Sequence, residues 1–120
     1  LGGHLAASIG STIQADVDGF VIEGAFASHD EIGADASGLG WFAKMMIREI
    51  YSGEDRIGAI EKPVTIIHST EDSTVPFKHG ERLFEAATSP KVFYKIDGRH
   101  ILGPLLYPDS IEIKMLEMLE

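Results

Sequence analysis

Hydrophobic residues recur along the chain at two spacings, and the spacing separates predicted helices from predicted strands. Over residues 4–14, Leu5, Ile9 and Ile13 lie four positions apart, which places them on one face of a helix. Strands are expected over the short apolar, β-branched runs at 19–22, 63–68 and 91–96. The first run is apolar at both alternating positions, which is typical of a strand covered on both faces in a parallel sheet.

Further helices are expected between and after the strands, over residues 41–51, about 77–87, and from about 109 onwards. In the last of these, Asp109 and Glu112 have the spacing of a capping box, which predicts the helix start. Ile111, Met115 and Leu119 then follow at intervals of four. Strands that alternate with helices predict an α/β fold with a parallel sheet and right-handed crossovers.

Composition excludes several classes of function. The chain has 120 residues, the size of one domain, and its 44% hydrophobic content is that of a globular protein. No apolar run is long enough for a membrane span. Ten basic against nineteen acidic residues give a net charge of −9, which disfavours nucleic acids and anionic membrane surfaces as partners. The chain has no cysteine, which excludes thiolate chemistry and fits a reducing, cytoplasmic location.

Ionisable residues follow each of the three predicted strands. Glu23 comes after the first strand, Asp72 after the second and His100 after the third. Because the carboxyl ends of parallel strands meet at one edge of the sheet, we expect these side chains to lie near one another. A carboxylate beside an imidazole supplies two of the three groups of a proton relay, the third being the nucleophile. The acid orients the imidazole, and the imidazole moves the proton.

The segments around these residues resemble parts of the α/β-hydrolase superfamily of serine hydrolases. His68–Pro76 reads His-Ser-Thr-Glu-Asp-Ser-Thr-Val-Pro and resembles the family's acid loop, roughly His-Gly-x-x-Asp-x-x-Val-Pro. Gly98-Arg99-His100 resembles the catalytic-histidine loop, and 20–26 resembles the strand after the nucleophile helix. Leu1-Gly2-Gly3 resembles the residues that follow the serine in Gly-x-Ser-x-Gly-Gly. The Bem46-like or serine-aminopeptidase-like group is the most similar, over its C-terminal half.

The resemblance implies a hydrolase of esters, thioesters, amides or peptides. His100 would be the general base and then acid, Asp72 the triad acid, and Leu1 and Gly2 part of the nucleophile elbow and oxyanion hole. The serine would lie one position before Leu1, so we expect a piece of a longer protein that is inactive without its N-terminal half. The whole chain would be one partial domain, with 25–60 as a cap whose apolar residues Trp41, Phe42 and Met45 line a pocket for an acyl or other hydrophobic group. No organic cofactor or metal is implied.

Several residues have alternative interpretations. Ser8 lies in a small-x-Ser-x-Gly pattern, but inside a predicted helix rather than on a strand-to-helix elbow, so we expect no nucleophile there. Glu23 is the second candidate for the triad acid, or else a carboxylate that orders a loop. We expect His68 to pack at its strand end, His79 to lie on the exposed side of its helix, and His4 to be solvated or near a pocket mouth.

Two alternatives to a triad also follow from the sequence. A metal site is disfavoured, because His68 and Asp72 lie across a strand-to-loop junction and the chain has no His-Glu-x-x-His motif. The chain could instead be a non-catalytic module that binds a partner or its own copy. In that case a bare sheet edge along Phe20–Ile22 would pair with another strand.

Overall fold

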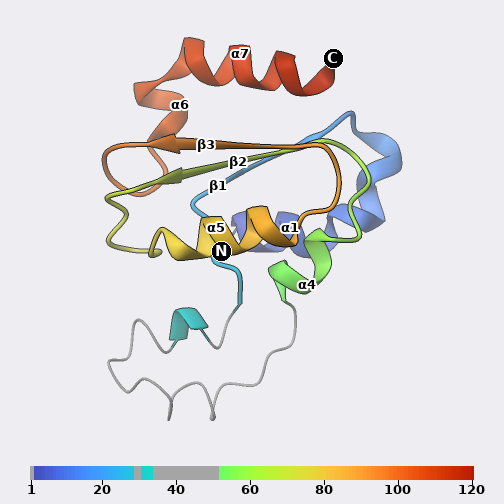
Figure 1. Cartoon of the computed structure of the whole chain (residues 1–120), viewed down its shortest axis with the longest axis horizontal. Coiled ribbons are helices and arrows are strands. Elements are labelled where there is room, and N and C mark those ends of the chain that lie inside the picture. The colour runs from blue at the N-terminus through green and yellow to red at the C-terminus, as the bar shows by residue number, and fades with distance from the viewer. Residues whose placement is uncertain (1, 29–30, 34–51) are drawn as a thin grey trace.

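The computed structural model describes residues 2–28, 31–33 and 52–120 (Figure 1). In chain order its elements are helix α1 (Gly2–Ile13), the 3-10 turn η1 (Gln14–Asp16), β1 (Phe20–Glu23), α4 (Gly53–Ile57), β2 (Val64–Ser69), α5 (Lys78–Ala86), β3 (Lys91–Ile96), α6 (Gly103–Leu106) and α7 (Pro108–Leu119). The predicted helix over 41–51 lies outside the described residues. No helix in the described part of the chain is long and apolar enough to cross a membrane.

The strands form a parallel sheet in the order β1-β2-β3, which confirms the predicted α/β class. Phe20 of β1 lies opposite Val64 of β2, and Val64 lies opposite Lys91 of β3. Every residue of the central strand is buried, as expected for a strand covered on both faces. Because all three strands run the same way, their carboxyl ends and the loops that follow share one edge.

Helices cover both faces of this sheet, so the described residues form three layers (Figure 1). The larger apolar core lies between the sheet and α1, α4 and α5. Its buried members are Ala7, Phe20, Ile22, Ala25, Ala27, Ile57, Ile60, Val64, Ile66, Leu83 and Ala87. On the other face α7 packs on β2 and β3, where Ile67, Ile96 and Ile111 form a second, smaller core.

The apolar face predicted for α1 is present, but it does not pack on the core. Leu5, Ile9 and Ile13 share one face, but that face is 45%, 49% and 38% exposed. The helix instead buries Ala7, Ser8 and Gly10 with His4 against β1 and the α4 region, and close approach needs small residues: a Cβ on Gly10 would overlap the Ile60 side chain. Packing through small residues therefore leaves the larger side chains outward.

Strand β1 is also less covered than its sequence predicts. Phe20 and Ile22 are buried against α1, but Val21 on the opposite face is 38% exposed. The physical reason is the position of α7, which packs on β2 and β3.

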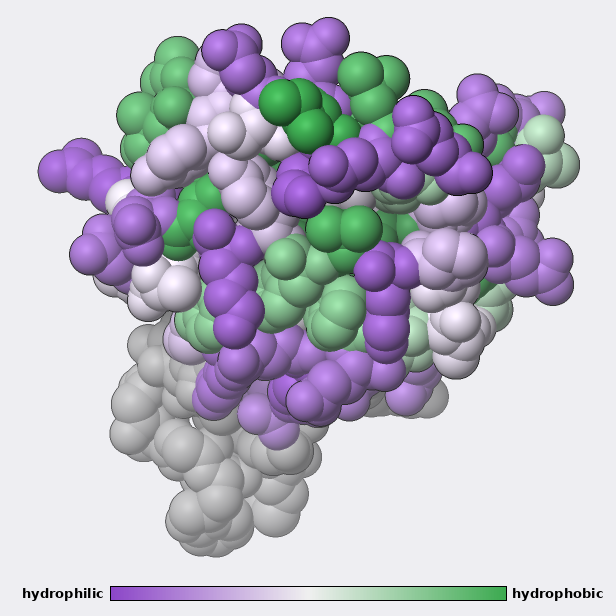
Figure 2. All heavy atoms as spheres, turned by 45° about the horizontal axis from the view of Figure 1, so that its top comes forward, coloured by the Kyte–Doolittle hydropathy of each residue, from purple (hydrophilic) through white to green (hydrophobic). Residues whose placement is uncertain are grey.

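The C-terminal region differs from the prediction in two ways. Helix α7 begins at Pro108, whose fixed φ suits the first helical position, and its N-cap is Tyr107 without a side-chain cap. The capping box predicted at Asp109 is therefore wrong, since Asp109 lies within the first turn. The sequence pattern also does not predict the short helix α6. Large apolar side chains of α6 and α7 reach the surface among polar ones on the face seen in Figure 2, with Leu105 75% exposed.

Within the 25–60 segment, Ala27 and Glu54 lie side by side. The Glu54 backbone N–H donates to the Ala27 carbonyl oxygen at 3.0 Å, and Ser52 caps α4 by accepting from Asp55 N–H at 3.2 Å. Ala27 and Ile57 are both fully buried. The segment between residues 28 and 52 therefore starts and finishes at one place on the core.

Candidate catalytic site

Asp72 lies in the loop after β2 and is held by its own turn. Its Oδ1 accepts hydrogen bonds from the backbone N–H groups of Thr74 and Val75, both at 2.8 Å. This is the local bonding that makes aspartate common in turns. The side chain is 1% exposed, so the carboxylate has one orientation, with Oδ2 available for a partner.

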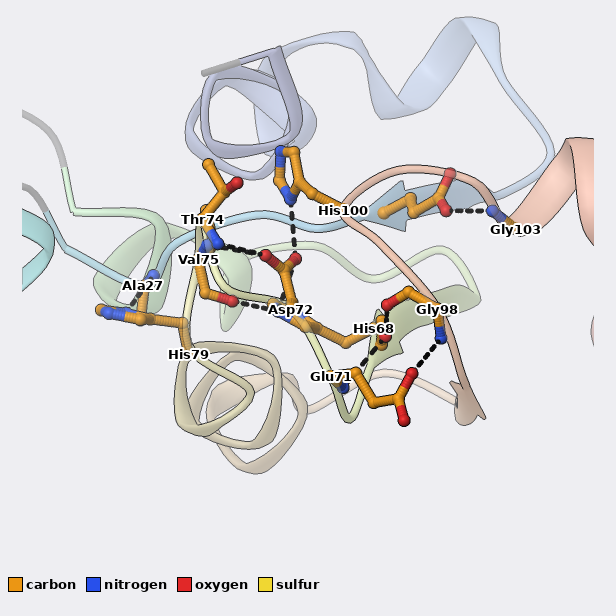
Figure 3. A network of polar contacts seen from close by, with 12 residues as sticks. Ala27, His68, Glu71, Asp72, Thr74, Val75, His79, Gly98, His100 and Gly103 are labelled. Carbon is orange, nitrogen blue, oxygen red and sulfur yellow. Dashed lines mark hydrogen bonds and ion pairs between the residues drawn. The ribbon is translucent and has the colours of Figure 1, made fainter.

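That partner is His100, from the loop after β3. Its Nδ1 lies 2.7 Å from Asp72 Oδ2 (Figure 3). A carboxylate can only accept, so Nδ1 carries the proton and the neutral imidazole has Nε2 as its basic atom. The His100 side chain is 24% exposed, and Figure 3 shows its second nitrogen pointing away from Asp72. The ring is therefore oriented as a base that can take a proton from outside the pair.

The surroundings of Asp72 favour its charged form. Burial raises the pKa of Asp72, but hydrogen bonds from Val75 N–H, His100 and Thr74 N–H, with the charge of His100, outweigh burial. The pKa of this carboxyl consequently lies below its ordinary value. An ionised Asp72 at neutral pH can stabilise a protonated His100.

The carboxyl end of β1 forms the floor under the His100 ring. Gly24 has φ +57°, and a Cβ at this position would lie 2.8 Å from His100 Cε1 and 3.0 Å from Nδ1. The start of α1 lies against the same segment, because a Cβ on Gly3 would lie 2.8 Å from the Ala25 Cβ and 3.1 Å from the Glu23 carbonyl oxygen. The N-terminal turn of α1 and the His100 ring thus border the same three residues of chain.

The loop that carries His100 is bonded at both ends. At its beginning, Gly98 N–H donates to Glu71 Oε2 at 3.0 Å, and the Gly98 carbonyl accepts from the Ser69 hydroxyl (Figure 3). At its end, Gly103 N–H donates to Glu23 Oε1 at 2.6 Å. Sequence reasoning missed these three contacts except for the general expectation that Glu23 orders a loop.

Backbone strain lies between those two ends. Ile101 has φ 51°, in the left-handed region that a β-branched residue rarely adopts. Such a conformation costs about 1–2 kcal/mol for an L-residue. The loop conformation therefore depends on contacts made from outside it.

Three of the remaining histidines are fully buried. His68 packs at the end of β2 as predicted, with Nε2 donating to the Val75 carbonyl at 2.9 Å and lying 3.5 Å from Asp72 Oδ2. The prediction that His79 lies on the exposed side of its helix is wrong: it is 0% exposed, and its Nδ1 accepts from Ala27 N–H at 3.2 Å.

Of the two places predicted for His4, the solvated one is also wrong. His4 is 0% exposed, its Nδ1 lies 3.0 Å from the Phe26 carbonyl oxygen, and its ring stacks on that of Phe26. His4 and His79 thus both bind the segment that follows β1. Their neighbours in the fold, rather than their helical positions, decide the burial.

The remaining candidates are the alternative nucleophile, the elbow residues and the expected pocket residues. Ser8 is buried within α1 and its hydroxyl donates to the His4 carbonyl at 2.9 Å, so it faces no elbow. Gly2 is the first residue of α1, and a Cβ there would have no neighbour within 4 Å. The elbow residue Leu1 and the expected pocket residues Trp41, Phe42 and Met45 lie outside the described part of the chain.

Two surface hollows lie elsewhere on the described residues. One, of about 290 Å³, lies along α6 and α7, and the other, of about 310 Å³, lies between α5 and β3. Their walls include neither Asp72 nor His100. Neither hollow is therefore the substrate pocket of this pair.

Comparison with known proteins identifies the fold. No family model matches the chain. The uncharacterised protein YfhR of Escherichia coli O157:H7 is 31% identical over 103 residues, which are 83% of this chain and 35% of YfhR. The chain thus spans about a third of the length of the curated relatives it matches.

Solved structures match over nearly the whole chain. The esterase domain of a Rhodothermus marinus protein has a TM-score of 0.75 at 17% identity, over 100% of this chain and 58% of that one. MGS-MChE2, an α/β-hydrolase enzyme from a lagoon-sediment metagenome, has a TM-score of 0.67 at 21% identity, over 98% and 56%. An acylaminoacyl peptidase of Pyrococcus horikoshii has a TM-score of 0.69 at 16% identity, over 97% and 22%. The chain therefore has an α/β-hydrolase fold, over about half the length of the first two proteins.

Proposed function

We propose that Asp72 and His100 are the acid and the base of a Ser-Asp-His hydrolase. The observation that carries the proposal is the 2.7 Å contact between His100 Nδ1 and an Asp72 carboxylate already held by two backbone N–H groups. This arrangement sets the imidazole tautomer that general-base catalysis needs. The fold of esterases and of an acylaminoacyl peptidase supports acyl transfer as the reaction class.

The nucleophile in this proposal is a serine at the position before Leu1, at the start of α1. Support comes from the shared floor, since Gly3 and His100 both contact the residues that follow β1. The backbone N–H groups at the start of α1, including that of Gly2, would face the oxyanion. The chain would then be the C-terminal half of its catalytic domain, and residues 25–60 would form the cap over the acyl group.

The reaction follows from these positions. His100 Nε2 takes the serine Oγ proton as Oγ attacks the carbonyl carbon, and a C–O bond forms while the carbonyl electrons move to oxygen. Collapse of the tetrahedral intermediate breaks the bond to the alcohol, thiol or amine, which leaves with the proton from Nε2. Water then repeats the sequence, donating its proton to Nε2 and releasing the acid and the free serine. No cofactor takes part.

The test compares this chain with the polypeptide encoded by the whole reading frame. Intact mass spectrometry defines each sample, and a nitrophenyl ester and a fluorophosphonate probe then measure turnover and serine labelling. We expect both in the longer polypeptide and neither in a 13.0 kDa sample. His100→Ala should reduce turnover at least about 10³-fold. The proposal fails if the coding sequence before Leu1 does not end in Gly-x-Ser, or if His100→Ala hydrolyses the ester normally.

A second candidate function is self-association along β1. β1 is an edge strand of the sheet that the described residues form, and an uncovered strand edge pairs readily with another strand. Val21 of this strand and Leu5, Ile9 and Ile13 of α1 are all exposed by 38% or more and could add apolar contact. Sedimentation of the 120-residue chain over a range of concentrations tests it. A monomer at every concentration would exclude this function. A cytoplasmic location stays a prediction from composition.

A further inference from the structure

We propose that Glu23 is a positioning residue, whose carboxylate holds the His100 loop (residues 97–103) where His100 meets Asp72. The inference rests on the proposed role of the Asp72–His100 pair. It gives Glu23 a task that differs from that of a triad acid, since Glu23 acts on the loop and not on the imidazole.

The contact itself joins two distant parts of the chain. Glu23 ends β1, and its Oε1 accepts from the backbone N–H of Gly103, 80 residues later, at 2.6 Å. Gly103 is the residue at which the His100 loop ends and α6 begins. A Cβ on Gly103 would lie 2.7 Å from Glu23 Oε1, so any larger residue would displace the carboxylate from its present position. A carboxylate acceptor makes this a charge-assisted hydrogen bond, about twice as strong as a neutral one.

The loop needs such a contact because its own conformation is strained. Ile101, the residue after His100, has φ 51°. Strained residues persist where their surroundings hold them. At the beginning of the loop, Ser69 and Glu71 hold Gly98. Glu23 provides the corresponding contact at the end of the loop, so the strained residue lies between two anchors.

The residue after Glu23 ties the same strand end to the imidazole. Gly24 N–H donates to the Ile67 carbonyl at 3.0 Å, which fixes the end of β1 to β2. The Gly24 backbone then lies under the His100 ring. One dipeptide therefore anchors the loop through a side chain and supports the ring through its backbone. Movement of the loop end would shift His100 relative to Asp72, whose own turn holds it in place.

NMR of the 120-residue chain tests this without any hydrolysis assay. Two signals are followed: hydrogen exchange at the Gly103 amide, and the Nδ1 proton of His100, assigned by its loss in His100→Gln. In Glu23→Ala we expect Gly103 exchange to become about tenfold faster, as for loss of a hydrogen bond to a charged group. We also expect the Nδ1 proton signal to disappear, because the ring leaves Asp72.

Matched variants separate positioning from general stability. Glu23→Gln keeps an acceptor oxygen and should keep both signals. In Gly103→Ala the new Cβ displaces the Glu23 carboxylate, so the Nδ1 signal should again be lost. If Glu23→Ala does not fold, Gly103→Ala and Glu23→Gln together test the proposal. Glu117→Ala removes an equal charge from an exposed residue that pairs with Lys114, and should leave both signals unchanged.

The outcomes are distinct from those of the proposed function. The inference is overturned if the Nδ1 signal survives in Glu23→Ala while Gly103 exchange accelerates, since Glu23 would then only stabilise α6. It is also overturned if Glu23→Gln behaves like Glu23→Ala. Absence of serine labelling in the longer polypeptide would refute the hydrolase proposal. It would not change either NMR signal, so the two proposals can fail separately.

Discussion

Replacing Asp72 by asparagine separates the two halves of its hydrogen bonding. The amide side chain would keep an oxygen for the Thr74 and Val75 N–H groups. Its NH₂ group would instead meet the Nδ1–H of His100, donor against donor, so the 2.7 Å bond is lost. The imidazole then favours the other tautomer, with its proton on Nε2. A serine hydrolase with that tautomer has a base that cannot accept the serine proton.

The cost in stability follows from what is lost. A hydrogen bond to a charged group contributes about 1.5–3 kcal/mol. In the other tautomer Nδ1 can accept a neutral hydrogen bond from the new amide NH₂ group, or from water at this 24% exposed side chain, which places the loss at the lower end, about 2 kcal/mol. Urea unfolding at pH 7 should show a midpoint lower by about 1 M with an unchanged slope. Asp18→Asn, at an exposed position, is the control and should change stability by less than about 0.5 kcal/mol.

The pH dependence has a definite sign. Burial raises the pKa of Asp72 and its hydrogen bonds lower it by more, so the folded pKa lies below the unfolded one. The stabilisation of the fold by ionised Asp72 is therefore complete above the unfolded-state pKa of about 3.9. It is lost as the pH falls through the lower pKa of the folded state. The difference between wild type and Asp72→Asn that comes from the Asp72 carboxylate should shrink below about pH 4. A difference that persists unchanged to about pH 2, or no difference at about pH 7, would refute this account.

Two further substitutions, each with a control, are measured by urea unfolding: one at the backbone under the His100 ring and one in the apolar core. Gly24→Ala should destabilise by about 1–3 kcal/mol, because φ is +57° and the new Cβ lies 2.8 Å from His100 Cε1. Gly2→Ala, with no atom within 4 Å, is its control for stability, and equal effects would contradict the steric argument. Leu83→Ala, at 0% exposure, should cost about 2–5 kcal/mol. Leu105→Ala, at 75% exposure, should cost less than about 0.5 kcal/mol, and a larger cost would show that this residue is covered in solution.

Much of the fold can be predicted from local pattern. The sequence predicts the strand at 91–96 with its observed bounds and that at 63–68 within one residue, because β-branched runs between turn residues have few alternatives. Parallel strands then place the residues after them at one edge. The sequence alone is therefore enough to bring Asp72 and His100 to the same side of the sheet, 28 positions apart.

Only the tertiary structure decided which faces and which polar groups are buried. Apolar spacing identified a face of α1, but small residues pack closer, and so Leu5 and Ile9 point outward. His79 is fully buried, and its partner there is the backbone N–H of Ala27, 52 residues away. The Glu23–Gly103 bond spans 80 residues. Periodicity and motif reflect interactions between near neighbours in the chain, whereas burial, tautomer and loop anchoring depend on partners that only folding brings together.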